Sequence, residues 1–268
     1  MKKTRFTILA TLLTLMVGTN AWGWGRDVHA TITYIAERHL TPQAKANIEA
    51  CIDGRSIVYY ASWMDNHQEE SKMWRHSSYY DKDTHKPVGT AYTELSTTIE
   101  KLGDYKSLSE TECRHRLYHL LHALGDFHCP GHTYFQNADR SFKRNTHYNV
   151  VWIDNKETSY HTVWDILLVR YLRSAFGYMD FGHSLDCNIP QQYVEQVTAG
   201  TLYDWMCETA NRCVHIYDKF PKRKKGTPKE ELGHFDLDLV QEYSRLADEQ
   251  ILKAGLRMAK VLNETFGK

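Results

Sequence analysis

The stretch from Leu117 to His132 reads LYHLLHALGDFHCPGH, and the interpretation of the whole chain starts from it. His122 and Asp126 are four residues apart, and positions i and i+4 of an α-helix lie on the same face. The two side chains can therefore point at one metal ion. His132 follows a Pro-Gly break, where the chain can leave the helix and turn back toward the same site. This stretch predicts a helix that carries part of a metal site.

The predicted helix has two different faces. At about 100° per residue, one face is apolar and consists of Cys113, Leu117, Leu120, Leu121 and Leu124. The opposite face carries His115, His119, His122 and Asp126. A solvent-exposed face would usually carry Lys and Glu, so this composition favours a site. His115 and His119 are not assigned as ligands, because a chance polar stripe explains them equally well.

Residues of the same kind recur along the chain. His161-Thr-Val-Trp-Asp165 repeats the His-x3-Asp spacing. One more Asp and two more His lie upstream: Asp65, His29 and His76. A lone His or Asp on a helix is usually structural, and two pairs can arise by chance in a chain with 15 histidines. Combined with the Trp-x4-His pattern that begins at Trp24, the set becomes specific for metal binding.

The first 23 residues have the pattern of a secretory signal peptide. They contain a basic start, an apolar run too short to span a membrane and small residues at a cleavage site: Lys2, Lys3 and Arg5; residues 6–17; and Ala21-Trp22-Gly23. We therefore expect residues 1–23 to be removed and residues 24–268 to form one domain of a secreted or periplasmic protein. A short membrane anchor is the alternative interpretation. Cleavage after Ala21 instead of Gly23 also fits the pattern.

Composition narrows the classes of function. The full chain has 33 basic and 33 acidic residues, and without residues 1–23 the basic count falls to 30, a net charge of −3. This balance is not the basic footprint of a general nucleic-acid-binding protein. The six cysteines lack the CxxC spacing of a zinc ribbon, so we assign the metal chemistry to His and Asp. An exported chain permits disulfides, and six cysteines allow 15 pairings, among which the sequence does not choose.

Helical signals dominate the chain after residue 24. We expect helices through Ile32 and Ile35, from Thr41-Pro42 to about Ile52, over 57–67, over 90–103, from the Ser109-x-x-Glu112 capping box onward, over 193–197, over 202–216 and over 236–265. Residues 72–89 have no clear period and are predicted to be a functional loop. Residues 149–155 suggest a short strand and turn. The sequence therefore predicts a single all-α domain with at most a short β-hairpin.

These motifs give the chain a resemblance to the zinc-dependent S1/P1 nucleases, which share a helical fold with bacterial zinc phospholipases C. The resemblance runs from Trp24 to about Asn263. Its most specific parts are His122-Ala-Leu-Gly-Asp126, Pro130 to His132 and His161-Thr-Val-Trp-Asp165. Further matches are Ala61-Ser62-Trp63-Met64-Asp65, Gln250-Ile251 and Gly255-Leu-Arg257-Met-Ala259.

The resemblance implies a cluster of three Zn²⁺ ions per chain. The first ion would be held by Asp65, His76, His122 and Asp126. The second would be held by His132, His161 and Asp165. The third would be held by Trp24, through its free amine and carbonyl, with His29 and Asp126. Only a freed α-amine can bind metal, so cleavage after Ala21 would remove the terminal ligand of the third ion. Nitrogen and oxygen donors of this kind suit zinc.

The chain departs from the family pattern next to the first ion. The family has a His directly before an aromatic-aliphatic-Asp run, whereas here Ser78 precedes Tyr79-Tyr80-Asp81. His76 stands two residues earlier, and we favour it as the ligand, with a local insertion. If His76 is not the ligand, the first ion lacks one donor.

The resemblance further implies hydrolysis of single-stranded DNA or RNA, or of 3′-nucleotides, by a metal-activated hydroxide. Asp126 and Asp65 would be the catalytic carboxylates, with Asp126 bridging two ions. Tyr79 would stack on a base, and Asp81 and Asn145 would bond its edge. In the family a glycine pair precedes that Asn, whereas Lys143-Arg144 stands there in this chain, and Gln68 replaces a basic residue found in several family nucleases. No stable protein partner is implied.

Two alternatives remain open from the sequence. The first is a phospholipase C acting on phospholipid, although the five-residue step from Trp24 to His29 and the Asp at 165 both favour a nuclease. The second is a non-enzymatic exported metal-binding protein, which the altered segment 76–81 would suit.

Overall fold

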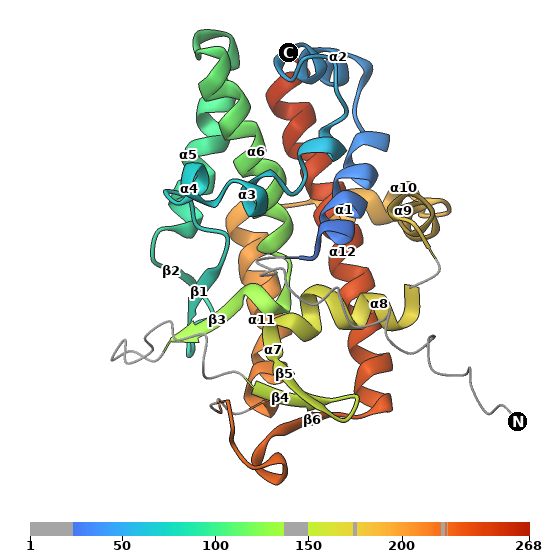
Figure 1. Ribbon diagram of the computed structural model, residues 1–268. Helices are drawn as coiled ribbons and strands as arrows, with labels where there is room; N and C mark the ends of the chain where they lie inside the picture. Colours follow the sequence, from blue (N-terminus) through green and yellow to red (C-terminus); the bar gives the residue numbers. More distant parts are fainter. Residues whose placement is uncertain (1–23, 137–149, 174–175, 221–222, 224) are drawn as a thin grey trace, which may run out of the picture.

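The computed structural model describes residues 24–136, 150–173, 176–220, 223 and 225–268. Most of them are helical, which confirms the predicted all-α class (Figure 1). The longer helices are α1 (Arg26–Arg38), α2 (Pro42–Cys51), α5 (Ala91–Leu102), α6 (Glu110–Asp126), α9 (Tyr178–Asp186), α10 (Gln191–Thr198), α11 (Leu202–Lys219) and α12 (Leu237–Phe266). The shorter ones are η1 (Ile57–Tyr60), α3 (Trp63–Asn66), α4 (Gln68–Ser71), η2 (Tyr105–Ser107), η3 (Pro130–His132), α7 (Tyr160–Thr162), η5 (Val163–Leu167), α8 (Leu168–Arg173) and η6 (Lys229–Glu231).

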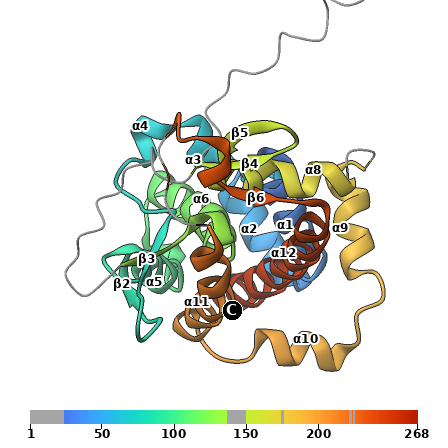
Figure 2. The ribbon, with the colours of Figure 1, turned by 90° about the horizontal axis from the view of Figure 1, so that it is seen from below.

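The long helix α12 forms the axis of the helical layer. Its start is capped by Asp236, whose Oδ1 accepts a hydrogen bond from the Leu239 N–H at 2.9 Å. Helices α1, α2, α8 and α10 pack against it, and Figure 2 looks roughly along it. A Cβ on Gly255 would lie 2.6 Å from Cγ2 of Ile35, so glycine is needed for the close contact between α12 and α1. This contact holds α1, and with it His29, in the core.

Helix α6 is buried on both of the faces that the sequence distinguishes. Ser109 caps it by accepting the Glu112 N–H at 3.2 Å, while the Glu112 carboxylate pairs with Arg116 instead of completing the predicted capping box. The leucines of the apolar face are inaccessible to solvent. On the opposite face His122 and Asp126 are also 0% exposed. A fully buried His and Asp require polar or ionic partners, because unpaired buried charge is costly.

The helix predicted over residues 57–67 is broken into η1 and α3. The break falls at Ala61 and Ser62, between the two elements. Because the chain leaves regular helix here, the Ala61 carbonyl accepts a hydrogen bond from His122 Nδ1 at 3.2 Å. The irregularity therefore orients a predicted metal ligand, a contact that helical periodicity does not reveal.

A three-stranded sheet contains part of the segment 72–89. Its strands are β1 (Ser78–Asp81), β2 (Pro87–Val88) and β3 (Thr133–Gln136), in the order β2-β1-β3. Strand β1 runs parallel to β3 with Ser78 opposite Thr133. The residues just before the two strands, His76 and His132, are therefore neighbours although they are far apart in sequence. This sheet is strand structure beyond the single hairpin that the sequence predicts.

The predicted hairpin is formed by β4 (Val150–Ile153) and β5 (Lys156–Ser159), and β6 (Gly233–Phe235) pairs with β4 in parallel. Asp154 and Asn155 have φ values of 50° and 56°, as a two-residue turn with positive φ at both positions requires. Strand β5 leads into α7 and then into η5, a π-helical segment that carries Asp165. Such segments are frequent at functional sites.

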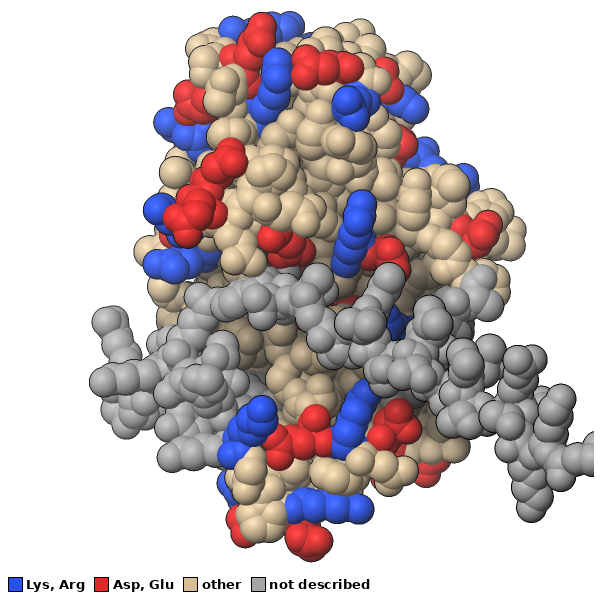
Figure 3. All heavy atoms as spheres, viewed as in Figure 1, with Lys and Arg blue, Asp and Glu red and all other residues tan. Residues whose placement is uncertain are grey.

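The described surface has no single dominant charge on the side seen in Figure 3. Lys and Arg side chains lie among Asp and Glu side chains across this side. The picture agrees with the balanced composition of the chain. Among the described residues, no helix is both long and apolar enough to span a membrane.

A buried network of polar side chains joins the end of α6 to α11 and α12. His128 Nδ1 donates to the Leu124 carbonyl at 2.8 Å, and its Nε2 accepts from Arg257 Nη1 at 3.0 Å. Arg257 also pairs with Glu208. His128 is thus fixed as the neutral tautomer. Burial, together with the charge of Arg257, lowers its pKa to about 3.

The low pKa of His128 predicts that the free energy of unfolding falls in acid. Because the folded-state pKa of His128 lies below the unfolded value of about 6.5, its contribution is complete above that pH and falls as the pH drops toward 3. We expect His128→Gln to reduce the pH dependence of the unfolding free energy by about 1.4 kcal/mol per pH unit between pH 6 and 4. Urea unfolding of both proteins in chelator measures this. Parallel pH profiles would contradict the assignment.

Candidate metal centre

Nine residues assigned from the sequence converge on one buried region. They come from the start of α1, from α3, from the segment before β1, from α6, η3, α7 and η5: Trp24, His29, Asp65, His76, His122, Asp126, His132, His161 and Asp165. Six of the nine, including Asp126 and Asp165, are at most 1% exposed. The fold therefore gathers donors from widely separated parts of the chain, and α6 supplies the central pair.

The first group surrounds Oδ2 of Asp126. His122 Nε2 lies 3.2 Å from this oxygen, and His76 Nδ1 lies 3.3 Å from it. Asp65 Oδ1 lies 3.5 Å from His122 Nε2 on the other side. The structure therefore places His76 next to Asp126, on the same oxygen as His122. The parallel pairing of β1 with β3, described above, is the physical reason.

The second oxygen of Asp126 faces a different set of donors. The Trp24 backbone N–H donates to Oδ1 at 3.2 Å, and His29 Nε2 lies 3.3 Å from the same oxygen. The Trp24 indole is held in place by a 2.9 Å hydrogen bond to the Gly125 carbonyl. Two of the sets of donors that are close enough to hold one ion share Asp126: one contains His29 and His122, and the other contains His76 and His132. The rings of His29 and His122 stack with centroids 4.1 Å apart, so the donors predicted for the first and third ions are in contact.

A third group lies around Asp165. His161 Nε2 is 3.0 Å from Asp165 Oδ2 and 2.8 Å from His132 Nε2. His132 Nε2 is 3.7 Å from Asp165 Oδ1. The sulfur of Cys129 also belongs to this group, at 3.5 Å from Asp165 Oδ1. Cysteine spacing in the sequence does not reveal Cys129, because no CxxC pair contains it and this thiol meets its neighbours only in the fold.

Outer contacts orient two of the imidazole rings. His132 Nδ1 donates to the His76 carbonyl at 2.9 Å and lies 3.2 Å from Ser77 Oγ. His122 Nδ1 donates to the Ala61 carbonyl, as described above. In each ring this leaves Nε2 directed at the carboxylates. Metal-binding histidines are typically fixed in this way, with one nitrogen bonded to a carbonyl or carboxylate and the other on the ion.

The donor set fits bound metal ions. Several buried atoms that face the centre have no hydrogen-bond partner among the described residues: His29 Nε2, His76 Nδ1, His122 Nε2, Asp126 Oδ2 and Asp165 Oδ2. Buried polar atoms without partners are rare, because each costs free energy. Three sets of His, Cys and carboxylate donors are close enough together to hold an ion. Metal ions at these positions would satisfy the atoms that the protein leaves unpaired.

Burial without a bound cation shifts the pKa values of several donors. Burial raises the pKa of Asp65 to about 7 and that of Asp165 to about 8. Burial lowers the pKa of His29 to about 4, which keeps its imidazole neutral. Burial would also raise the pKa of Asp126, but the nearby imidazoles, first among them His132, hold it well below its ordinary value. Burial alone would lower the pKa of His122, but the Asp126 and Asp65 carboxylates raise it to about 9. Because ionised carboxylates and neutral imidazoles are the forms that bind metal, metal binding here would release protons.

A family model for S1/P1 nucleases matches residues 24–267. The chain belongs to the S1/P1 nuclease family. Endonuclease 5 of Arabidopsis thaliana is 23% identical over 98% of this chain and 97% of its own length. Nuclease PA3 of a Penicillium species is 23% identical over 91% of this chain and 98% of its own length. Nuclease P1 of Penicillium citrinum is 23% identical over 59% of this chain and 62% of its own length.

Membership of the S1/P1 nuclease family supports nuclease activity and dependence on metal. The resemblance drawn from the sequence motifs is thereby confirmed. The matched segment spans every ligand candidate from Trp24 to Asp165.

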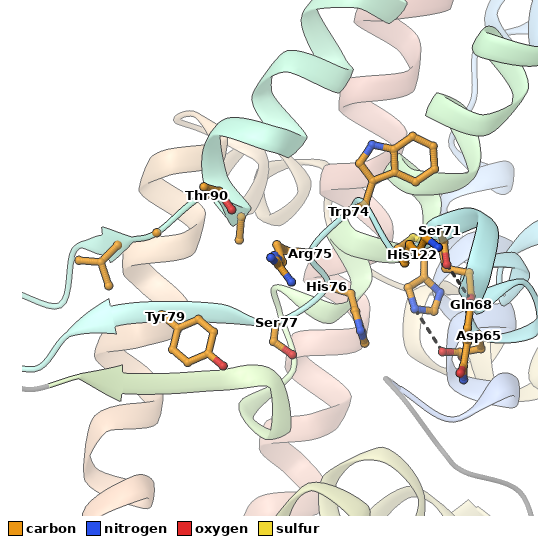
Figure 4. A pocket seen from close by; sticks show the side chains of 15 residues that line it. Asp65, Gln68, Ser71, Trp74, Arg75, His76, Ser77, Tyr79, Thr90 and His122 are labelled. Atoms are coloured by element: carbon orange, nitrogen blue, oxygen red, sulfur yellow. Dashed lines mark hydrogen bonds and ion pairs between the residues drawn. The ribbon is translucent and has the colours of Figure 1, made fainter. Parts of the chain in front are cut away.

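A pocket of about 500 Å³ opens beside the first group of this S1/P1-type centre (Figure 4). At one end it is lined by Asp65, His76 and His122, which point toward one another. Gln68 and Ser71 lie beside Asp65, while Tyr79 and Thr90 lie toward the other end (Figure 4). The lining also includes Lys72, Trp74, Arg75 and Val88. The pocket therefore joins donors for metal to aromatic and basic side chains within one cavity.

The three substrate-binding predictions have different positions. Tyr79 lines the pocket and stacks on Tyr134 with ring centroids 5.5 Å apart. Asp81 does not line it; its Oδ1 instead accepts hydrogen bonds from the Thr84 N–H at 2.7 Å and the Thr84 hydroxyl at 2.8 Å. Asn145 lies outside the described residues. Of the two that the structure describes, Tyr79 lines the pocket and Asp81 does not.

The two histidines of α6 that were left unassigned lie beside the centre. His119 Nδ1 bonds to Thr98 Oγ1 at 2.8 Å, and its ring stacks on Trp74 at 4.9 Å with an interplanar angle of 6°. His115 packs against Trp63 at 5.0 Å. His119 thus supports a tryptophan that lines the pocket, which explains a polar residue on this face without a metal.

Proposed function

We propose that this protein is a zinc-dependent phosphodiesterase that hydrolyses single-stranded nucleic acids, 3′-nucleotides or both. The observation that carries the proposal is the Asp126 carboxylate, which two sets of metal donors share next to a third set, with His76 and His122 lining an aromatic pocket. Nitrogen and oxygen donors with one sulfur are a ligand set that zinc accepts. Three ions, one for each donor group, would complete the centre.

Bound zinc ions lower the pKa of water and neutralise charge that develops on phosphate oxygens. The residues of the chain supply the remaining requirements. Asp65 lines the pocket together with His76 and His122, and a phosphodiester would sit beside these three side chains. Asp126 lies behind them, with its Oδ2 3.3 Å from His76 Nδ1 and 3.2 Å from His122 Nε2. Lys72 and Arg75 line the same pocket and would attract the phosphate backbone.

The pocket also suits an unpaired base. Aromatic side chains bind single strands because the faces of their bases are free to stack. Trp74 and Tyr79 are available within the same cavity as the metal donors. A duplex keeps its bases stacked on one another, so we propose preference for single-stranded substrates.

A panel of substrates tests this proposal. Purified protein loaded with Zn²⁺ is assayed on single-stranded DNA, duplex DNA, RNA, 3′-AMP and phosphatidylcholine, with His122→Ala as the inactive comparison. We expect cleavage of single strands or 3′-AMP that is lost in the variant and in chelator. Turnover of phosphatidylcholine alone would establish a phospholipase C. Zinc binding with no turnover of any substrate would establish a non-enzymatic metal-binding protein.

We further propose that residues 1–23 are a signal peptide and that the protein acts outside the cytoplasm. The Trp24 nitrogen already lies 3.2 Å from Asp126 Oδ1, so removal of residues 1–23 would convert it into a terminal amine at the same place. The thiols of Cys51 and Cys113 contact each other and are the pair best placed to form a disulfide after export. Mass spectrometry of the exported protein tests both proposals. A mass that includes residues 1–23 would contradict the first, and free thiols at both positions would contradict the second.

Tyr79→Ala tests the role of the aromatic wall. Stacking on one base is worth about 1–3 kcal/mol, so we expect KM for a short single-stranded oligonucleotide to rise about tenfold with a smaller change in kcat. Tyr59→Ala is the matched control, because Tyr59 is 67% exposed and does not line the pocket. Equal KM values for the two variants would show that Tyr79 does not contact the base.

A further inference from the structure

The Cys129 thiol lies at the third donor group, beside the side chains assigned to the second zinc ion. Its sulfur is 3.5 Å from Asp165 Oδ1, and the residue is fully buried. Donor atoms of Cys129, His132 and Asp165 all lie within 4.8 Å of one another. Asp165 Oδ2, on the same carboxylate, is buried and has no hydrogen-bond partner among the described residues. The nearest donor to this oxygen given by the structure is His161 Nε2, at 3.0 Å. A buried carboxylate, two imidazoles and a buried thiol therefore face the same small volume.

The local backbone directs the sulfur into this volume. Cys129 directly precedes η3, and its carbonyl accepts hydrogen bonds from the His132 N–H at 3.0 Å and from Thr133 Oγ1 at 3.0 Å. A Cβ on Gly131 would lie 3.3 Å from the Cys129 sulfur and 3.3 Å from Asp165 Oδ1. Glycine at 131 thus leaves room for the thiol and the carboxylate to approach each other. These contacts hold the Cys129 side chain on the side of the turn that faces Asp165.

We propose that Cys129 is a thiolate ligand of the zinc ion that His132, His161 and Asp165 would hold. The inference rests on the proposed zinc centre. Zinc lies about 2.3 Å from a thiolate and about 2.0 Å from nitrogen or oxygen, so donors on one ion are about 3 to 4 Å apart. The separations described above for this group run from 2.8 Å to 3.7 Å. Binding replaces the S–H bond with a sulfur–zinc bond and releases the proton to solvent.

A fourth protein ligand would change the role of this ion. Zinc with three protein ligands keeps an open position for water or substrate, whereas zinc with four protein ligands is closed. A site of one sulfur, two imidazoles and one carboxylate would be closed. The ion at Asp165 would then have a structural role and supply positive charge. Exchange of water and substrate would take place at the two ions that share Asp126.

Cobalt substitution tests the sulfur bond directly. The full mature protein is loaded with Co²⁺, and its absorption spectrum is recorded. A thiolate bound to cobalt gives an intense charge-transfer band in the near ultraviolet, which nitrogen and oxygen ligands do not give. We expect this band in the wild-type protein. X-ray absorption of the zinc protein should show a sulfur neighbour at about 2.3 Å. Neither measurement on the wild-type protein depends on a variant that folds.

Two serine variants assign the band to one cysteine. In Cys129→Ser we expect the band to disappear and one zinc ion to bind about tenfold more weakly or worse. Cys213→Ser is the matched control, since Cys213 is also buried but belongs to none of the donor groups. It should keep both the band and the zinc affinity. A band that survives in Cys129→Ser would overturn the assignment.

The test of Cys129 as a zinc ligand can fail independently of the proposed nuclease function. A metal-loaded wild-type protein without the band would overturn the Cys129 assignment, even if it cleaves single strands. In that case the thiol only donates a hydrogen bond to Asp165. A band in a protein that hydrolyses none of the panel substrates would support the ligand and refute the nuclease. Failure of the wild-type protein to bind zinc or cobalt would refute both.

Discussion

Asp126→Asn is expected to lower nuclease activity by more than about 100-fold, the upper end of what loss of an outer metal contact costs. An amide cannot supply two anionic oxygens, so the donor groups on its two sides both lose a ligand. The zinc content should fall by more than one ion per chain. Activity on an oligonucleotide and metal analysis of the same preparation measure the two effects together.

Asp186→Asn is the matched control for this variant. Asp186 is another buried carboxylate, but it pairs with Arg38 at 3.0 Å and His39 at 3.2 Å, away from the metal donors. We expect its loss to lower stability while leaving the zinc content and the activity of the folded protein unchanged. If Asp126→Asn lost only one ion, or behaved like Asp186→Asn, the bridging role of Asp126 would be refuted.

Removal of metal should produce the second large effect. At a free zinc concentration about a thousandfold above the dissociation constant, each bound ion adds about 4 kcal/mol to the free energy of unfolding. Without bound metal, no cation lies beside the buried carboxyl groups of Asp126 and Asp165. For a domain of this size about 1 kcal/mol corresponds to about 2–4 °C, so chelator should lower the Tm by at least about 8 °C. Calorimetry before and after dialysis against chelator measures the change.

Readdition of different ions provides the control. Zn²⁺ should restore the Tm and the activity, because the donors are mostly imidazole nitrogens. Ca²⁺ should restore neither, since it binds sets of six to eight oxygen atoms. In Asp126→Asn the chelator should have a smaller effect on the Tm than in the wild-type protein. A Tm that does not respond to chelator would mean that the centre holds no metal in the folded protein.

The sequence predicted the part of the centre that depends on local spacing. His122 and Asp126 meet because one helix places positions i and i+4 together, and this relation is the same in every helix. The sequence alone left open whether His76 is a ligand. Its position depends on the parallel pairing of β1 with β3, across more than fifty residues. Sequence periodicity contains no information about such a pairing.

Two other features were not predicted, for related physical reasons. The helix expected over 57–67 fits its local periodicity, but the fold breaks it at Ala61 to expose a carbonyl to His122. Tertiary contacts often override local helix propensity in this way. Cys129 was set aside because no second cysteine stands nearby in sequence. Its neighbours are Asp165 and His132, and the first of these comes from a different helix.

The buried position of Trp24 has a practical consequence for producing this protein in the laboratory. Its indole is anchored to Gly125 and its backbone nitrogen faces Asp126. An affinity tag fused directly before Trp24 would keep that nitrogen as an amide. It would also place additional residues against the metal donors around Asp126. A tag after Lys268 would instead extend from an exposed residue beyond the end of α12. Recombinant protein intended for metal analysis should therefore carry its tag at the carboxyl end.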